Sequence, residues 1–131
     1  VKVELNTVGD YQMFANERDN KNYDIFVGGW FSDYNDPLDF LNVMKTGVYD
    51  SYGLYSNSEY DSLIDSLTGE NDNAKRLEIY QKLEDLLVAQ DCGVAPLYYS
   101  DKHYYYQNWV KDFYTSSFGA SQELYRASVQ K

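Results

Sequence analysis

The chain has 131 residues, with 21 acidic and 11 basic side chains and a formal net charge of −10, which argues against nucleic acid or an anionic membrane surface as a partner. This length allows one modest core but no second full domain, and no apolar run approaches the roughly twenty residues that cross a bilayer. Residues 1–5 match neither a signal peptide nor a lipoprotein cleavage site, so we expect any export signal to lie outside this chain.

The first part of the chain is predicted to form a β-α-β unit. Alternating apolar residues indicate a strand over 1–5, and the spacing of Tyr11 and Phe14 indicates a helix over about 8–20. An apolar run indicates a buried strand over 23–27. Two strands joined by such a helix are parallel, with a right-handed crossover. We therefore expect an α/β fold.

Residues 28–37 join the second predicted strand to a helix and contain two glycines, large aromatic side chains and acids. In open α/β sheets, ligands bind at the carboxyl ends of strands. Asp36 and Asp39 are explained by the N-cap and the dipole of a helix that begins at Pro37. Asp33 has no such role, so it is either a carboxylate held partly out of water to meet a cation or a solvated loop aspartate.

Three helices are predicted in the middle of the chain. The first covers about 37–46 and stops at Gly47, and a tyrosine-rich surface loop follows over 48–55. Ser58 to Asp61 has the spacing of a capping box that opens the second helix. The third helix ends at about Gln90. The apolar residues that we expect in the core of the last two helices are Leu63, Ile64, Leu67, Leu77, Tyr80, Leu83, Leu86 and Leu87.

Further strands are predicted after these helices, over 94–99 and 102–106, and residues 123–129 are another candidate strand. Pro96 places the first of them at a sheet edge or a bulge. Of the 23 aromatic residues 15 are tyrosines, which suit a pocket that accepts varied side chains. A half-exposed sheet explains a run such as 104–106 equally well, because strands favour tyrosine.

The sequence offers no set of residues for covalent or metal chemistry. Cys92 is the single cysteine, so there is no internal disulfide, and we expect it to be a small buried residue. His103, the single histidine, has no companion for a nucleophile or a zinc site. Residues 33–37 resemble a calcium loop superficially, but proline fills the fifth place and the turn glycine is missing. We predict no metal and no cofactor.

At residues 28–37 the chain resembles the extracytoplasmic oligopeptide-binding proteins that feed ABC importers, which are solute-binding proteins of family 5, the peptide/nickel type. Their strand-to-helix junction reads Gly-Trp-x-x-Asp-Tyr-x-x-Pro, and Trp30, Asp33, Tyr34 and Pro37 match it. Further matching segments are 16–18, 23–24, 60–64, 76–80, 95–99 and 109–110. Because the family's members are several times longer, the chain is similar to their C-terminal portion.

This resemblance implies a fold and a domain assignment. Residues 1–131 would form a single partial domain, part of one lobe of a two-lobed protein. That lobe has the type II periplasmic-binding-protein architecture, in which a mixed sheet is flanked by helices.

The resemblance also implies site residues. In the oligopeptide-binding branch, the aspartate at the position of Asp33 receives the free α-ammonium of the peptide, and the tryptophan at Trp30 lines the neighbouring side-chain pocket. Arg18 aligns with a basic residue that approaches the peptide C-terminus in some relatives, although a charge facing the helix dipole explains it equally. The whole expected ligand-binding set is Asp33, Trp30, Phe31, Tyr34, Arg18, Tyr98 and Tyr99.

Two positions depart from the family's pattern. Val27 stands where some relatives have a second arginine, and Ser100 replaces the third residue of a tyrosine triplet whose first two members are Tyr98 and Tyr99. The length of the peptide and the recognition of its C-terminus are therefore not implied for this chain.

The implied mechanism is binding without catalysis, in which two lobes close on an extended peptide and a membrane permease recognises the closed form. The expected partners are an oligopeptide and permease subunits, with no nucleic acid and no direct membrane insertion by this segment. The expected location is extracytoplasmic, as a periplasmic protein or a cell-surface lipoprotein.

Other functions remain open from the sequence. Within the same family the ligand is a signalling peptide, a sugar or a nickel chelate in some relatives. A glycoside-acting enzyme would pair Asp33 with a second carboxylate such as Asp24 or Asp50. A structural role would be favoured if Asp33 and Trp30 were buried in the packing of the domain itself.

Overall fold

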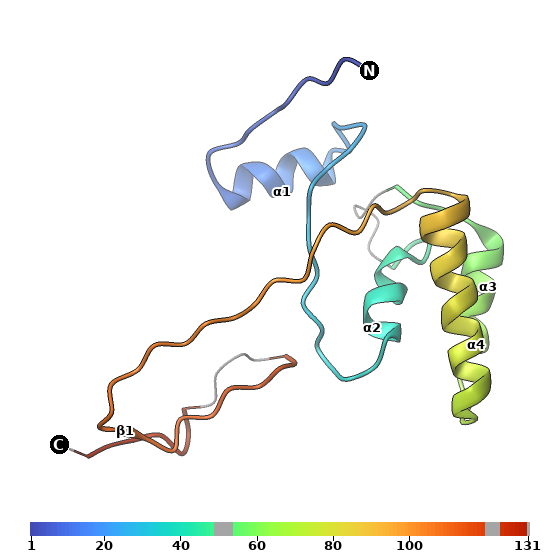
Figure 1. Cartoon of the computed structure of the whole chain (residues 1–131). Helices are drawn as coiled ribbons and strands as arrows, with labels where there is room; N and C mark the ends of the chain where they lie inside the picture. Colours follow the sequence, from blue (N-terminus) through green and yellow to red (C-terminus); the bar gives the residue numbers. More distant parts are fainter. Residues whose placement is uncertain (49–53, 120–123, 131) are drawn as a thin grey trace.

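The structure, a computed structural model, describes residues 1–48, 54–119 and 124–130. In chain order the elements are α1 (Tyr11–Asp19), α2 (Leu38–Leu41), the 3-10 helix η1 (Asn42–Met44), α3 (Ser58–Ser66), α4 (Asn73–Glu84), the π-helix η2 (Asp85–Gln90), β1 (Val110–Lys111) and β2 (Ser128–Val129). Drawn-out segments of chain lead from α1 to α2 and from the end of the helical part toward β1 (Figure 1). Among the described helices, none has the length and apolar character needed to cross a membrane.

The hydrophobic core lies between the helices of the middle of the chain. Helices α2, α3 and α4 pack together, whereas α1 stands apart from them (Figure 1). Tyr60 is completely buried, and its hydroxyl donates a hydrogen bond of 2.7 Å to the carbonyl of Leu41. Burial raises the pKa of Tyr60, so this hydroxyl keeps its proton. The core residues are Leu41, Val43, Met44, Tyr60, Ile64, Leu67, Tyr80, Leu83, Leu86 and Leu87.

The predicted helices are present, and side-chain caps lie at the start of α1, α3 and α4. Asp10 accepts a hydrogen bond of 2.8 Å from the amide of Met13 at the start of α1. Asn57, not Ser58, caps α3, since its side-chain oxygen accepts the amides of Glu59 and Tyr60. The predicted capping box is therefore wrong, because an asparagine one residue earlier already satisfies the free amides.

One predicted core residue is exposed. Leu77 is 57% exposed, while Tyr80 and Leu83 of the same helix are buried. The buried stripe is centred on Leu83, and a residue six positions earlier lies roughly 120° away around the helix. Leu63 is partly buried against the core, and Ile64 and Leu67 are buried as predicted.

The expectation of a buried Cys92 is wrong. Cys92 is exposed and has a φ of 51°, at the point where the chain leaves η2. The next residue, Gly93, makes the close approach instead, since a Cβ there would lie 2.7 Å from the ring of Tyr55. The tight packing at this turn is possible because glycine has no side chain. The thiol of Cys92 lies outside this packing and is exposed.

The described residues form one small antiparallel sheet, and its first strand, β1, was not predicted. β1 pairs with β2, with Val110 opposite Val129 and Lys111 opposite Ser128, so the candidate strand at the C-terminal end is confirmed in its last residues. The segments 1–5, 23–27, 94–99 and 102–106 form no strand. The predicted parallel β-α-β unit and mixed sheet are therefore not formed within the described residues, because a strand needs a partner for its backbone groups.

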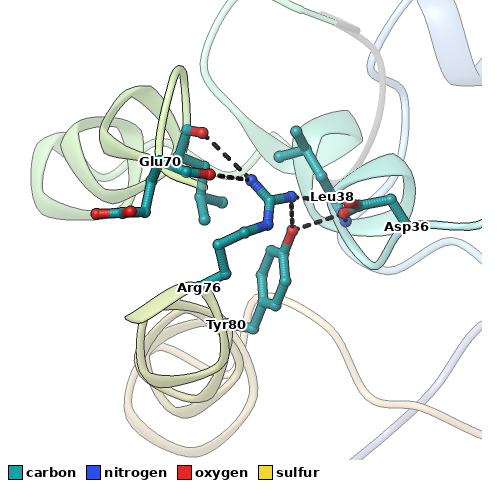
Figure 2. A network of polar contacts seen from close by, with 6 residues as sticks. Asp36, Leu38, Glu70, Arg76 and Tyr80 are labelled. Carbon is teal, nitrogen blue, oxygen red and sulfur yellow. Dashed lines mark hydrogen bonds and ion pairs between the residues drawn. The ribbon is translucent and has the colours of Figure 1, made fainter. Parts of the chain in front are cut away.

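A polar network centred on Arg76 joins the helices to the loop that precedes α2 (Figure 2). Its Nη2 lies 2.7 Å from Oδ2 of Asp36, and its Nη1 donates to the carbonyls of Leu67 at 3.3 Å and Glu70 at 3.2 Å. The hydroxyl of Tyr80, one turn further along α4, donates to Oδ1 of Asp36 at 2.6 Å. Three separate parts of the chain therefore meet at one guanidinium group.

The network shifts the pKa values of Asp36 and Tyr80. Burial alone would raise the pKa of Asp36, but the hydrogen bonds from Tyr80 and the Leu38 amide and the charge of Arg76 outweigh it and lower the pKa below its ordinary value of 3.8. Burial, followed by the hydrogen bond to Asp36 and its charge, raises the pKa of Tyr80 to about 12. At neutral pH the carboxyl is ionised and the phenol is protonated.

Replacing Arg76 should destabilise the helical core. We expect Arg76→Met to lower the free energy of unfolding by about 2 to 3 kcal/mol, because it leaves the half-buried Asp36 without its counter-charge. The matched control is Lys75→Met, since Lys75 is 65% exposed and its Nζ lies 3.8 Å from Glu70. Urea unfolding of the two variants compares them, and equal losses would contradict the role of Arg76.

The contribution of Asp36 should depend on pH with a defined sign. Because its folded-state pKa is lowered, the stabilisation is fully present above about pH 5 and is lost as the pH falls through the folded pKa. The difference in unfolding free energy between wild type and Asp36→Asn should therefore be large at about pH 6 and small at about pH 3. Asp65→Asn is the control, since Asp65 forms an ion pair in which its side chain is 66% exposed. A constant difference for Asp36→Asn would contradict the expectation.

Candidate functional site

A pocket of about 390 Å³ lies between α1 and the loop that leads to α2. Helix α1 contributes Phe14 and Arg18 to its lining, and the loop contributes Trp30, Phe31 and Asp33. The pocket therefore combines aromatic walls with one group of each charge. The phenylalanine and arginine share a face of α1 because they are four residues apart, about one helical turn.

The structure brings together four of the seven residues predicted to bind a ligand, namely Asp33, Trp30, Phe31 and Arg18. The other three do not line the pocket. Tyr34 follows Asp33 directly and is 47% exposed. Tyr98 and Tyr99 lie on the segment after η2 and are 81% and 97% exposed, so their side chains face solvent in this chain.

Arg18 lines the pocket while its charge is paired. It stands in the last turn of α1, where a cation also interacts favourably with the helix dipole. Its guanidinium contacts Oδ1 of Asp19 at 2.8 Å, and its side chain is 14% exposed. Both explanations of this arginine that the sequence leaves open are compatible with its position.

The loop residues Trp30 and Asp33 are held by a carboxylate that the sequence interpretation assigned only to the helix dipole. Oδ2 of Asp39 accepts the indole Nε1–H of Trp30 at 3.1 Å and the backbone N–H of Asp33 at 2.8 Å. Asp39 is 7% exposed and is the buried charged residue of the described chain. The earlier explanation is therefore incomplete, because a residue that serves only a dipole has no need to be buried.

Two residues from the distant C-terminal part also contact the loop, and no sequence signal pointed to them. The ammonium of Lys102 lies 5.0 Å from the centroid of the Phe31 ring, within the range of a cation–π interaction. The backbone N–H of Gly119 donates to the carbonyl of Ser32 at 2.9 Å. Such contacts depend on where the chain returns in space, which no local spacing encodes.

The ring of Phe26, which forms an aromatic wall of the pocket, requires a glycine beside it. The ring of Phe26 lies 5.1 Å from that of Tyr23 and 6.1 Å from that of Phe14, measured between centroids. It also lies against Gly28, where an added Cβ would come within 2.4 Å of its Cε2 atom. At Gly29 a Cβ would meet nothing within 4 Å. Gly28 therefore leaves the space that the ring of Phe26 occupies.

The chemistry of the pocket favours binding over catalysis. Asp33 is exposed and is the one carboxylate among the described lining residues. Asp24 does not line the pocket, and Asp50 lies outside the residues that the structure describes. A cation with an apolar body would meet the carboxylate at its charged end and the aromatic rings along its body.

Comparison with known proteins shows what this chain is similar to. It is 31% identical to the oligopeptide-binding protein OppA of Bacillus subtilis over 114 residues, which are 86% of this chain and 19% of that protein. It is 30% identical to the periplasmic oligopeptide-binding protein OppA of Salmonella typhimurium over 101 residues, or 77% of this chain and 18% of that one. The chain spans about a fifth of the length of these relatives. No family profile matches it.

Two solved structures share the fold of nearly the whole chain. The substrate-binding domain of an oligopeptide ABC transporter from Bacillus anthracis matches with a TM-score of 0.80 and 28% identity, and the pheromone receptor PrgZ matches with a TM-score of 0.77 and 27% identity. Each match covers 95% of this chain and 24% of the other. The Bacillus subtilis relative is an oligopeptide-binding protein, and the Bacillus anthracis structure is a substrate-binding domain.

The two adjacent glycines allow a matched test of the aromatic wall. Gly28→Ala should displace the ring of Phe26 from Phe14 and Tyr23, because the new methyl group and the ring cannot occupy the same space. Gly29→Ala should leave the ring in place. Aromatic NMR signals of Phe26 report the difference, and an unchanged spectrum in Gly28→Ala would show that the wall does not depend on this glycine.

Proposed function

We propose, from the homology of this chain to oligopeptide-binding proteins, that it forms one wall of an extracytoplasmic solute-binding protein that captures oligopeptides and delivers them to a membrane permease. The pocket between α1 and the loop is the part of that site which this chain supplies. The observation that carries the proposal is the presence of Asp33 and Trp30, two of the four matching motif residues, together in the lining of one pocket.

In this proposal Asp33 receives the free α-ammonium of the peptide. Its side chain is exposed at the pocket, so a ligand reaches it without rearrangement of the loop. Trp30 and Phe31 receive the neighbouring apolar side chain of the peptide. A carboxylate–ammonium contact that is shielded by the ligand and the aromatic rings contributes on the order of 2 kcal/mol, which sets the register of the peptide.

The remaining predicted site residues take less direct roles in the proposal. Arg18 approaches the ligand from α1, with Asp19 sharing its charge. Tyr34, Tyr98 and Tyr99 face the cleft only once the rest of the protein is in place. Their exposed rings are then available to a ligand or to the opposite lobe.

The alternatives are less well supported by the geometry. A glycosidase needs two carboxylates flanking the scissile bond, and the described lining offers Asp33 alone. A purely structural role predicts that both motif residues serve internal packing. Trp30 does pack against the core, but Asp33 is exposed, and its hydrogen bond to Asp39 comes from its backbone N–H, which leaves the carboxylate to the pocket.

The domain assignment rests on the same homology to oligopeptide-binding proteins. We infer that residues 1–131 are part of one lobe, and that strands from outside this chain complete a mixed sheet of the type II periplasmic-binding-protein architecture. Support comes from the apolar side chains of unpaired segments, such as Val3, Leu5 and Val27, which are 73% to 81% exposed. Backbone groups in such segments pair with neighbouring strands when these are available.

The proposed setting is extracytoplasmic, as a periplasmic protein or as a cell-surface lipoprotein. Permease subunits are the proposed protein partners. A signalling peptide is a second candidate ligand, favoured by the structural similarity to the pheromone receptor PrgZ.

The central test measures peptide binding to the full-length protein that contains this chain. We expect calorimetry to show tighter binding of a peptide with a free N-terminus than of its acetylated twin. Asp33→Asn should reduce this preference roughly 30-fold, the equivalent of about 2 kcal/mol. Asp24→Asn is the control, because Asp24 does not line the pocket.

Each result of this test separates two interpretations. If the wild type prefers the free amine and Asp33→Asn keeps that preference, the anchor is another residue. If the wild type binds neither peptide, the ligand class is wrong, and sugars and nickel chelates are the next ligands to measure.

A further inference from the structure

We propose that Asp39 is a positioning residue for the ligand site, a buried carboxylate that holds the Trp30 side chain and the Asp33 backbone in their places beside the pocket. The expected effect of Asp39 on peptide selectivity rests on the proposed function. The expected effect of Asp39 on the position of Trp30 does not rest on it.

One oxygen atom carries both contacts. Oδ2 of Asp39 accepts the indole N–H of Trp30 at 3.1 Å and the amide N–H of Asp33 at 2.8 Å. The first donor belongs to an aromatic wall of the pocket and the second to the backbone of the proposed anchor. One atom of α2 therefore contacts both pocket residues.

Apolar packing cannot supply this positioning at Asp33. Phe31 is 63% exposed and Asp33 is exposed, so little of this part of the loop is buried. A hydrogen bond to an ionised acceptor is stronger than a neutral one. It gains further where water is excluded, and Asp39 is 7% exposed. The position of the Asp33 backbone consequently depends on its hydrogen bond to this carboxylate.

Asp36 and Asp39, three residues apart, have different roles. Asp36 reaches outward to Arg76 and Tyr80 of α4 and attaches the loop to the helical core. Asp39 reaches back to residues six and nine positions earlier and folds the loop onto the start of α2. Removing Asp36 should loosen the attachment of the loop, whereas removing Asp39 should release Trp30 and Asp33 from each other.

The experiment compares variants of Asp39 in the full-length protein with two measurements. The first is the ¹H–¹⁵N signal of the Trp30 indole, assigned by its disappearance in Trp30→Phe. The second is the ratio of dissociation constants for a free-amine peptide and its acetylated twin. We expect Asp39→Leu to shift the indole signal and to reduce the preference for the free amine about tenfold. Asp39→Asn keeps an acceptor oxygen and should retain most of both properties.

Asp61→Leu is the matched control. Oδ1 of Asp61 also accepts a backbone amide, that of Thr46 at 3.0 Å, but it does not line the pocket. This variant should lose stability while the Trp30 signal and the peptide preference stay unchanged. If Asp39→Leu fails to fold, Asp39→Glu moves the acceptor by one methylene group and should change the same two measurements in the same direction.

The outcomes distinguish this inference from the proposed function. If a folded Asp39→Leu or Asp39→Glu leaves both the indole signal and the peptide ratio unchanged, the positioning role is overturned. If the indole signal moves but the peptide ratio does not, Asp39 holds Trp30 for structural reasons only, and the inference is again overturned. If the wild type binds neither peptide, the proposed function fails, and the indole signal alone then decides whether Asp39 positions Trp30.

Discussion

The contact between the Arg76 guanidinium and the Asp36 carboxylate is the constraint on which the rest of this structure depends. The two residues are 40 positions apart, and their contact attaches the loop of the candidate site to the longest helix. The same guanidinium holds the turn between α3 and α4 through two backbone carbonyls. A lysine offers a point charge in place of this planar fork of donors. The Arg76 side chain therefore joins the helical core to the loop of the site.

Polar contacts, more than burial, give the site its shape. Asp39 holds Trp30 and the backbone of Asp33, and the Gly119 amide holds Ser32. This arrangement leaves the carboxylate of Asp33 exposed, as a group that meets a charged ligand must be. A loop held by buried apolar side chains would leave less polar surface at the pocket.

The described segments that have no strand partner expose apolar side chains. This exposure is consistent with a chain that spans about a fifth of the length of its relatives. Residues 1–5 and 94–106 are largely exposed although they contain valine, leucine and tyrosine side chains. Sheet formation is a property of neighbouring strands, whereas a helix satisfies most of its backbone groups internally. The helical middle of the chain is therefore well formed here, and the sheet is reduced to β1 and β2.

The sequence by itself determined the helices, most of their core residues and the motif that contains Trp30 and Asp33, because caps, apolar spacing and short motifs are local properties. It misplaced Leu77, since the direction of the buried stripe depends on what packs against α4. Only the tertiary structure decided that Asp39 contacts Trp30 and the backbone of Asp33, and that Lys102 lies over the ring of Phe31. Such contacts join residues whose distance along the chain carries no information about their distance in space.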